Sequence, residues 1–176
     1  MASTYLTRSV SSTGDRRKWT WSGWLKRGRT FSGGSDYIFS GNNGSNQYSM
    51  LAFASDTLRY YDYTSSFQSE IKTNRLFRDT NGYYHIVIIY DSAQSTASNR
   101  IKFYVNGVQE TSMQTSTYPS QNNDSYMNYS GVPFQIGRET GTNNYNGIMS
   151  HVHFTDGYAY DASYFGSTDA TTGEWK

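Results

Sequence analysis

The sequence of 176 residues has no cysteine, which excludes a disulfide framework. It has no run of 18 apolar residues that would insert into a membrane, and residues 1–5 (Met-Ala-Ser-Thr-Tyr) lack the pattern of a signal peptide. Charged residues make up only 16% of the chain. Fifteen basic and fourteen acidic side chains leave a net charge of +1, so we expect neither nucleic acid nor a membrane surface as a partner.

Aromatic residues, in contrast, are abundant. Seventeen tyrosines, nine phenylalanines and four tryptophans favour β-strands. Solubility must come from Ser, Thr, Asn, Gln and Gly, a composition common in extracellular and virion β-proteins. The length suits one domain with a sizeable core, and no linker or internal repeat interrupts it. We therefore expect a single domain over residues 1–176.

The most informative stretch lies near the middle of the chain. The run from Tyr84 to Tyr90 is apolar on both faces of an extended chain, which predicts a strand in the middle of a sheet. After a polar loop, strict alternation places Ile101, Phe103 and Val105 on one face of the next strand. Asn106-Gly107 is a strong signal for a two-residue hairpin, because a type I′ turn needs positive φ at both positions.

The remaining strands are short and no segment carries a helical period. They are predicted at residues 5–8, 17–27, 37–40, 48–54, 57–63, 67–72, 132–136 and 148–155. Residues 114–130 are almost wholly polar and predict a long loop. This pattern predicts an all-β fold, a two-sheet antiparallel β-sandwich.

Alternation also predicts which side chains face the core. In the second strand Trp19, Trp21 and Leu25 share one face, and Gly23 marks a bulge or a close backbone approach. In the last strand Val152 and Phe154 are predicted to face inward. The side chains of Met149, His151 and His153 are predicted to face outward. Asp161 is predicted to cap one helical turn.

The central stretch also carries a family resemblance. The pattern consists of an aromatic residue followed by His-Ile at 85–86, Tyr-Asp at 90–91, a loop, and Lys-Phe-Tyr-Val-Asn-Gly at 102–107. It resembles the central segment of concanavalin A-like jelly rolls, most of all the laminin G-like branch. Residues 18–27, 132–137 and 147–166 fit the same family in the expected order. These segments, together with Asp-Ala-Thr-Thr-Gly-Glu-Trp at 169–175, are similar to virion-associated domains of tailed phages of aquatic hosts. The resemblance implies a laminin G-like jelly roll located on the virion.

Several glucanases share this fold, so we tested the sequence for their chemistry. Retaining glycosidases need two carboxyl groups about 5 Å apart, which the hydrolases of this fold place in a Glu-x-Asp-x-Glu type of motif. None of the four glutamates, Glu70, Glu110, Glu139 and Glu174, begins such a motif. We therefore predict no catalytic residues. His85 is expected to be a packed, hydrogen-bonded structural residue, because no nucleophile motif accompanies it.

The sequence gives no firm metal site. His151 and His153 could share a metal with Asp156, but two half-exposed imidazoles on a strand face are the more ordinary arrangement. Some laminin G-like domains bind calcium at the rim of the sandwich, and four aspartates lie at strand–loop junctions, namely Asp36, Asp91, Asp124 and Asp156. Asp is also an ordinary turn residue. We predict no cofactor and no metal ligands, and leave a calcium ion open.

A binding surface remains. Sugars are recognised by aromatic faces that stack on the ring and by amides and carboxylates that bond the hydroxyls. Three polar loops, at residues 36–46, 118–126 and 138–145, contain this mixture, which is also the ordinary composition of β-turns. The residues predicted to bind a ligand are Asp36, Tyr37, Asn123, Asp124, Tyr126 and Tyr145. The other location considered is the sheet face beside His151 and His153.

The predicted function is a non-catalytic, lectin-like binding module, a phage virion or tail-fibre-associated domain that contacts host-surface glycans. The alternative is a purely structural virion protein, a decoration or fibre segment whose loops contact other virion proteins. Glycans or virion proteins are thus the expected partners. Self-association into a homo-oligomer is compatible with both functions.

Overall fold

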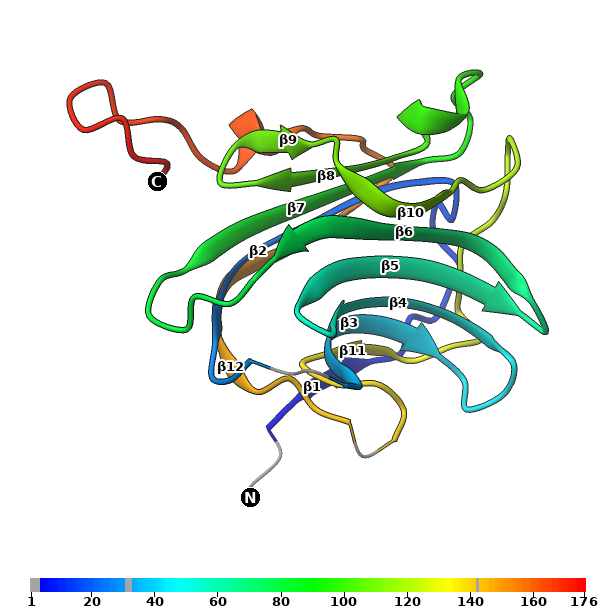
Figure 1. Cartoon of the computed structure of the whole chain (residues 1–176). Coiled ribbons are helices and arrows are strands. Elements are labelled where there is room, and N and C mark those ends of the chain that lie inside the picture. Colours follow the sequence, from blue (N-terminus) through cyan, green and yellow to red (C-terminus); the bar gives the residue numbers. More distant parts are fainter. Residues whose placement is uncertain (1–3, 31–32, 142) are drawn as a thin grey trace.

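The computed structural model describes residues 4–30, 33–141 and 143–176, and the first residues considered for a signal peptide, 1–3, lie outside that range. Two curved antiparallel sheets pack face to face (Figure 1). The strands are β1 (Leu6–Arg8), β2 (Lys18–Arg27), β3 (Ser35–Asn42), β4 (Gln47–Ala54), β5 (Thr57–Thr64), β6 (Phe67–Leu76), β7 (Tyr84–Asp91), β8 (Ile101–Val105), β9 (Val108–Glu110), β10 (Met113–Thr117), β11 (Phe134–Ile136) and β12 (Gly147–Asp156). Two 3-10 turns, η1 (Ala97–Asn99) and η2 (Ala162–Tyr164), complete the elements. Neither helical element of the described residues has the length or hydropathy needed to span a bilayer.

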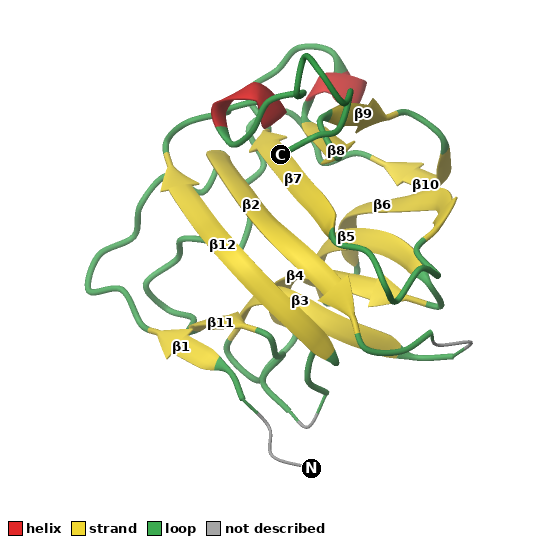
Figure 2. Ribbon diagram, turned by 90° about the vertical axis from the view of Figure 1, so that its left-hand side faces the viewer, coloured by secondary structure: helices red, strands yellow, loops and turns green. Residues whose placement is uncertain are grey.

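The strand order confirms the predicted two-sheet sandwich. One sheet has seven strands in the order β1-β11-β3-β4-β5-β6-β10, and the other has five in the order β12-β2-β7-β8-β9. Figure 2 shows β12, β2 and β7 of the five-stranded sheet face-on. Strands from the two ends of the chain lie side by side, because β2 pairs with β12 and β1 pairs with β11.

The central hairpin is confirmed in detail. Strand β7 is the middle strand of its sheet, and its last seven residues are all buried. Phe103 and Val105 of β8 point into the core, as their alternation predicts. Asn106 and Gly107 both have positive φ, 49° and 79°, as a type I′ turn requires.

The core is built from aromatic side chains. The Trp19 indole stacks on Tyr90, with ring centroids 5.2 Å apart, and donates a hydrogen bond from Nε1 to the Ser125 hydroxyl. Trp21 folds back over Gly23, where a Cβ atom would lie 2.7 Å from the indole. The close approach at Gly23 is therefore made by a side chain and not by backbone, and the pairing of β2 with β7 continues through Gly23 without a bulge. The Trp21 indole fills the position that would carry a third large side chain.

The last strand differs from the prediction at Met149. A bulge interrupts the pairing of β12 with β2 between Ser150 and His153, and His151 has a φ of 49°. Because a bulge inserts one unpaired residue, side chains before and after it change faces. Met149 therefore packs against the core together with Val152 and Phe154, so the prediction that it faces outward is wrong.

The polar segment 114–130 also differs from its prediction as a loop throughout. Residues 113–117 form β10, an edge strand that pairs with β6. Edge strands bury little surface, so a polar composition is compatible with them. Met127, further along the same segment, is completely buried and belongs to the core.

The chain after β12 crosses the outer face of the five-stranded sheet. Asp161 caps η2 by accepting a hydrogen bond from the Ser163 backbone amide, as predicted. Phe165 and Trp175 pack on a second apolar cluster of this outer face. His85 lies below Trp175 and is hydrogen-bonded at both ring nitrogens, which confirms it as a structural residue.

Candidate functional site

Three of the predicted site residues lie together at one end of the sandwich. The Asp124 carboxylate pairs with Arg17, 2.7 Å away, at the beginning of β2. The neighbouring Asn123 amide donates to the Tyr90 hydroxyl, and the Tyr126 hydroxyl accepts from Thr64. These contacts form a small polar cluster at the protein surface, although much of each side chain is already engaged by the fold.

Two further predicted residues lie at the opposite end, around a buried cation. The Asp36 carboxylate is buried and pairs with Arg27, at 3.7 Å, and with Arg29, at 2.6 Å. Tyr145 donates its hydroxyl hydrogen to the Lys26 carbonyl, and burial raises its pKa. The structure therefore separates Asp36 and Tyr145 from the residues at 123–126 by the length of β2. Thr142, within the same predicted loop as Tyr145, lies outside the described residues.

Tyr37 is placed elsewhere, on the outer face of the seven-stranded sheet. A register shift between Tyr37 and Phe39 allows Phe39 to enter the core while Tyr37 faces away from it. Its hydroxyl lies 3.5 Å from that of Tyr61 on β5. Tyr61 in turn contacts the rings of Tyr48 and Phe67, so Tyr37 borders a group of aromatic side chains on this outer face.

We define the tyrosine face as six side chains on the outer face of strands β3 to β6. Its members are Tyr37, Tyr48, Arg59, Tyr61, Tyr63 and Phe67. The register of β4, β5 and β6 places these residues next to one another, since Tyr48 pairs with Tyr63 and Tyr63 pairs with Phe67. Figure 1 shows β3 to β6 as neighbouring strands of one curved sheet.

Buried residues of β5 fix the orientation of this face. Tyr60 and Asp62 point inward, and the Asp62 carboxylate accepts hydrogen bonds from Ser49, Tyr60 and Ser69. Burial raises the pKa of Asp62, although these three donors oppose the shift. Because successive side chains of a strand alternate, inward Tyr60 and Asp62 force Tyr61 and Tyr63 outward.

The rings of the tyrosine face contact one another. Tyr48 and Tyr63 stack with centroids 4.9 Å apart and planes 9° apart. The Phe67 ring meets Tyr61 and Tyr63 edge-on, at 5.7 and 5.3 Å. Phe67 keeps 49% of its surface exposed, while Tyr37, Tyr48 and Tyr63 are half-buried. The rings therefore form an ordered layer with free surface.

Arg59 gives this aromatic layer a polar group. Its guanidinium lies over the Tyr61 ring, 4.2 Å from the centroid, and pairs with Glu70 at 2.7 Å. Burial raises the pKa of Tyr61, so its phenol is neutral at any physiological pH and serves as a donor or acceptor. The layer thus combines ring faces with a carboxylate, a guanidinium and hydroxyls, the groups that bind a polyol with an apolar face.

The sequence held one signal for this surface. In Tyr60-Tyr61-Asp62-Tyr63 aromatic residues occupy both faces of a predicted strand, whereas a strand with one solvated face normally has polar residues there. The sites predicted from the sequence are three loops and the sheet face beside His151 and His153, and they make no use of this signal. Tyr37 is the one residue shared by the predicted set and the tyrosine face.

Comparison with known families identifies the fold. A laminin G-type family model, described as the concanavalin A-like lectin/glucanases superfamily, matches residues 2–162. The chain belongs to this superfamily. No curated protein matches the sequence.

Several solved structures resemble this chain at low sequence identity. Domain 4 of AbnA, an extracellular arabinanase from Geobacillus stearothermophilus, in complex with arabinotriose, has a TM-score of 0.62 and 15% identity. The match covers 86% of this chain and 65% of that one. The CBM40 of a Ruminococcus gnavus sialidase bound to α2,3 sialyllactose has a TM-score of 0.54 and 10% identity, and the match covers 91% of this chain and 94% of the CBM40. Domains LG4-5 of the mouse laminin α1 chain have a TM-score of 0.58 and 13% identity, and the match covers 90% of this chain and 40% of the laminin chain.

Three of the four glutamates considered for catalysis have side-chain partners in the structure. Glu70 pairs with Arg59, and Glu110 pairs with Arg75 at 2.6 Å. Glu139 accepts a hydrogen bond from the Asn143 amide in an exposed loop. These contacts use the carboxylates to join neighbouring strands and turns.

The aspartates and histidines considered for metals lie in separate places. Across residues 4–30, 33–141 and 143–176, no three His, Asp or Glu side chains form a cluster that could hold a metal ion. His151 is exposed and hydrogen-bonds Ser150, while His153 lies over the Phe165 ring. Asp91 accepts a hydrogen bond from the Ala93 backbone amide in the turn that follows it, and Asp156 accepts one from the Asp15 backbone amide in the segment before β2.

Proposed function

We propose that this chain is a non-catalytic, lectin-like module that binds carbohydrate on the tyrosine face. The observation that carries the proposal is the layer of half-exposed rings around Tyr63 and Phe67. These rings lie on the face of the sheet opposite the core, so they keep solvent-accessible surface. The C–H side of a pyranose stacks on such rings, and its hydroxyls reach Arg59 and Glu70 at the edge. The sugars present in the structures of the arabinanase domain and the sialidase CBM40 support this type of ligand.

We further propose that the module acts on the virion surface of a tailed phage and contacts host-surface glycans. The support is the sequence resemblance of the segments around β7, β12 and residues 169–175 to virion-associated domains. A weak site of a few rings is adequate there, because many copies on one particle multiply a low affinity.

The test is a glycan array followed by titration of the best ligand. Replacing one stacking ring, as in Tyr63→Ala or Phe67→Ala, should weaken binding about fivefold, since each aromatic contact contributes about 1 kcal/mol. Tyr126→Ala is the matched control at the polar cluster of Asn123, Asp124 and Tyr126. Loss of binding only in Tyr126→Ala would move the site to Asn123, Asp124 and Tyr126.

One observation favours the alternative, a structural virion protein. Tyr158, Tyr160 and Tyr164 form an exposed stacked row, with centroids 5.2 and 4.3 Å apart. Tyr158 and Tyr164 expose 57% and 67% of their surfaces. Exposed aromatic rows of this kind also suit protein–protein contacts. A defined oligomer by light scattering, dissociated by Tyr164→Ser and indifferent to every glycan, would favour this second function.

A further inference from the structure

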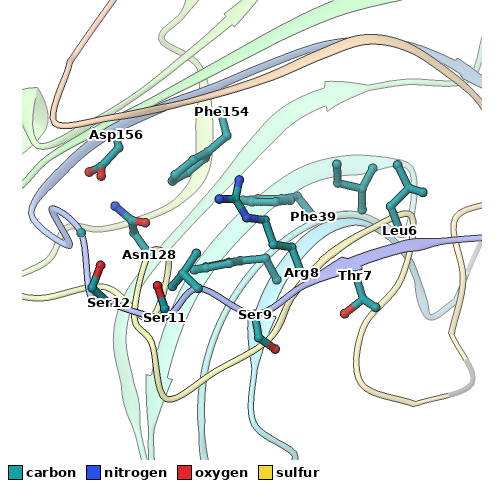
Figure 3. A pocket seen from close by; sticks show the side chains of 14 residues that line it. Leu6, Thr7, Arg8, Ser9, Ser11, Ser12, Phe39, Asn128, Phe154 and Asp156 are labelled. Carbon is teal, nitrogen blue, oxygen red and sulfur yellow. The ribbon is translucent and has the colours of Figure 1, made fainter.

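A hollow lies at the edge of the sandwich formed by β1 and β12, away from the tyrosine face. It has a volume of about 700 Å³ and lies between the segment from β1 to Gly14 on one side and the end of β12 on the other (Figure 3). We call it the edge cleft. Its size is that of a site for one small molecule or one or two sugar residues.

The wall of the edge cleft is aromatic. Phe39, Phe134 and Phe154 come from both sheets, and their ring centroids are 5.5 to 6.3 Å apart. Their planes differ by no more than 38°, so the rings offer roughly parallel surfaces. Phe154 remains half-buried, so part of its surface is open to a ligand.

Two opposite charges border this wall. Figure 3 shows the Arg8 side chain extending from β1 into the cleft, toward Phe154. Among the residues that the structure describes, the Arg8 guanidinium has no hydrogen bond or ion pair with a side chain, and Asp156 pairs with no cation. Asp156 accepts a hydrogen bond from the Asp15 backbone amide, through Oδ1. The hydroxyls of Ser11 and Ser12 and the Asn128 amide complete the polar lining.

We propose that the edge cleft binds a sugar residue that carries a carboxylate. A guanidinium that points into a cleft without a partner pairs best with a planar carboxylate, by two parallel hydrogen bonds. Asp156, Ser11 and Ser12 suit the hydroxyls of the same ring. The Phe154 ring, which keeps open surface beside the buried Phe39 and Phe134, suits its C–H face. Arg8 is exposed, so a neutral sugar would gain no ion pair from it, and an aliphatic acid would leave the hydroxyl-binding groups unused.

The proposal is independent of the tyrosine face and is tested with a matched pair of probes. D-glucuronate and D-glucose differ in one carboxylate, and their binding to the ¹⁵N-labelled chain is followed by amide shifts. We expect glucuronate to shift amides of residues 8–12 and 154–156 and to bind about tenfold more tightly than glucose at low salt. The preference should shrink as salt increases, because the cleft is open to solvent.

Variants assign the preference to Arg8. Arg8→Gln should abolish the discrimination between the two sugars, whereas Lys102→Gln, which removes the same charge from the outer face of the five-stranded sheet, should preserve it. Tyr63→Ala should also preserve it, so failure at the tyrosine face is distinguishable from failure here. Equal affinity for both sugars, an unchanged preference in Arg8→Gln, or a preference for the cation glucosamine would overturn the proposal.

Discussion

Trp175 and His85 lie 90 residues apart in the sequence and are joined by a hydrogen bond from the indole Nε1 to the imidazole Nδ1, 2.9 Å long. Because Nδ1 accepts, the proton of the neutral ring is on Nε2 and is donated to the Ser22 hydroxyl, also at 2.9 Å. The pair fastens the end of the chain to the outer face of the five-stranded sheet. A second proton on His85 would remove the acceptor that Trp175 requires.

This arrangement predicts a loss of stability in acid. Burial, assisted by the charge of His153, lowers the pKa of His85 to about 4, below its ordinary value of 6.5. A histidine with a lowered pKa in the folded state stabilises the fold above pH 6.5, and this contribution is lost as the pH falls through 4. The melting temperature should therefore decrease between pH 7 and pH 4. His85→Gln should flatten that decrease and His153→Gln should retain most of it; identical slopes in all three proteins would contradict the assignment.

Gly23 should not tolerate a methyl group. A Cβ atom there would meet the Trp21 indole at 2.7 Å, and that ring is fully buried. Overpacking of this kind costs about 1–3 kcal/mol, so Gly23→Ala should lower the denaturant midpoint clearly. Gly33→Ala is the control, because its added Cβ meets no atom within 4 Å. Equal midpoints for the two variants would show that the indole can move aside.

The two faces of β8 should respond differently to charge. Phe103 is completely buried and Lys102 is half-buried on the opposite face. An unpaired carboxylate in the core costs several kcal/mol, so Phe103→Asp should yield insoluble or unfolded protein while Lys102→Asp folds. Soluble expression and near-ultraviolet circular dichroism measure the difference. A cooperatively melting Phe103→Asp protein would contradict the prediction.

The buried cation Arg27 should be essential for stability. Its side chain is 1% exposed and lies between the carboxylates of Asp36 and Asp56, 3.7 and 2.8 Å away. Arg27→Met would leave these carboxylates without their shared buried partner, at a cost of about 3–5 kcal/mol. Arg78→Gln removes an exposed partner of Asp56 and should cost far less. Chemical denaturation of both variants compares the two losses.

Metal removal should change little. The four aspartates considered for calcium each have protein partners, such as Arg29 for Asp36 and Arg17 for Asp124. We expect EDTA to leave the melting temperature nearly unchanged, because aromatic and aliphatic packing builds the core. A large decrease that added calcium reverses would instead establish a rim site.

Much of the fold was predictable because it depends on local rules. Period-two alternation in β8, positive φ at Asn106 and Gly107, and the Asp161 cap each follow from a few neighbouring residues. Met149 could not be placed, because the bulge at His151 that reverses its direction is a property of the pairing with β2. Alternation alone carries no information about an inserted residue.

The candidate site was less predictable, since it is assembled from separate strands. Tyr48, Tyr63 and Phe67 become neighbours only through the register of three paired strands. The loop residues shared a composition but not a location, because β2 holds Asp36 and Asp124 at its two ends. Proximity in the sequence therefore identified Asn123, Asp124 and Tyr126 as one group, whereas it could not bring together the side chains of β4, β5 and β6.

The pairing of β2 with both β7 and β12 constrains how the chain can assemble. Leu25 pairs with Met149 across a sequence separation of more than a hundred residues, so a loop of that length must close before β12 can pair with β2. Folds dominated by such distant contacts acquire their native structure in milliseconds to seconds rather than microseconds. Neither half of the chain holds a complete sheet, so two fragments cut between β6 and β7 should be unstructured alone and regain structure only when mixed.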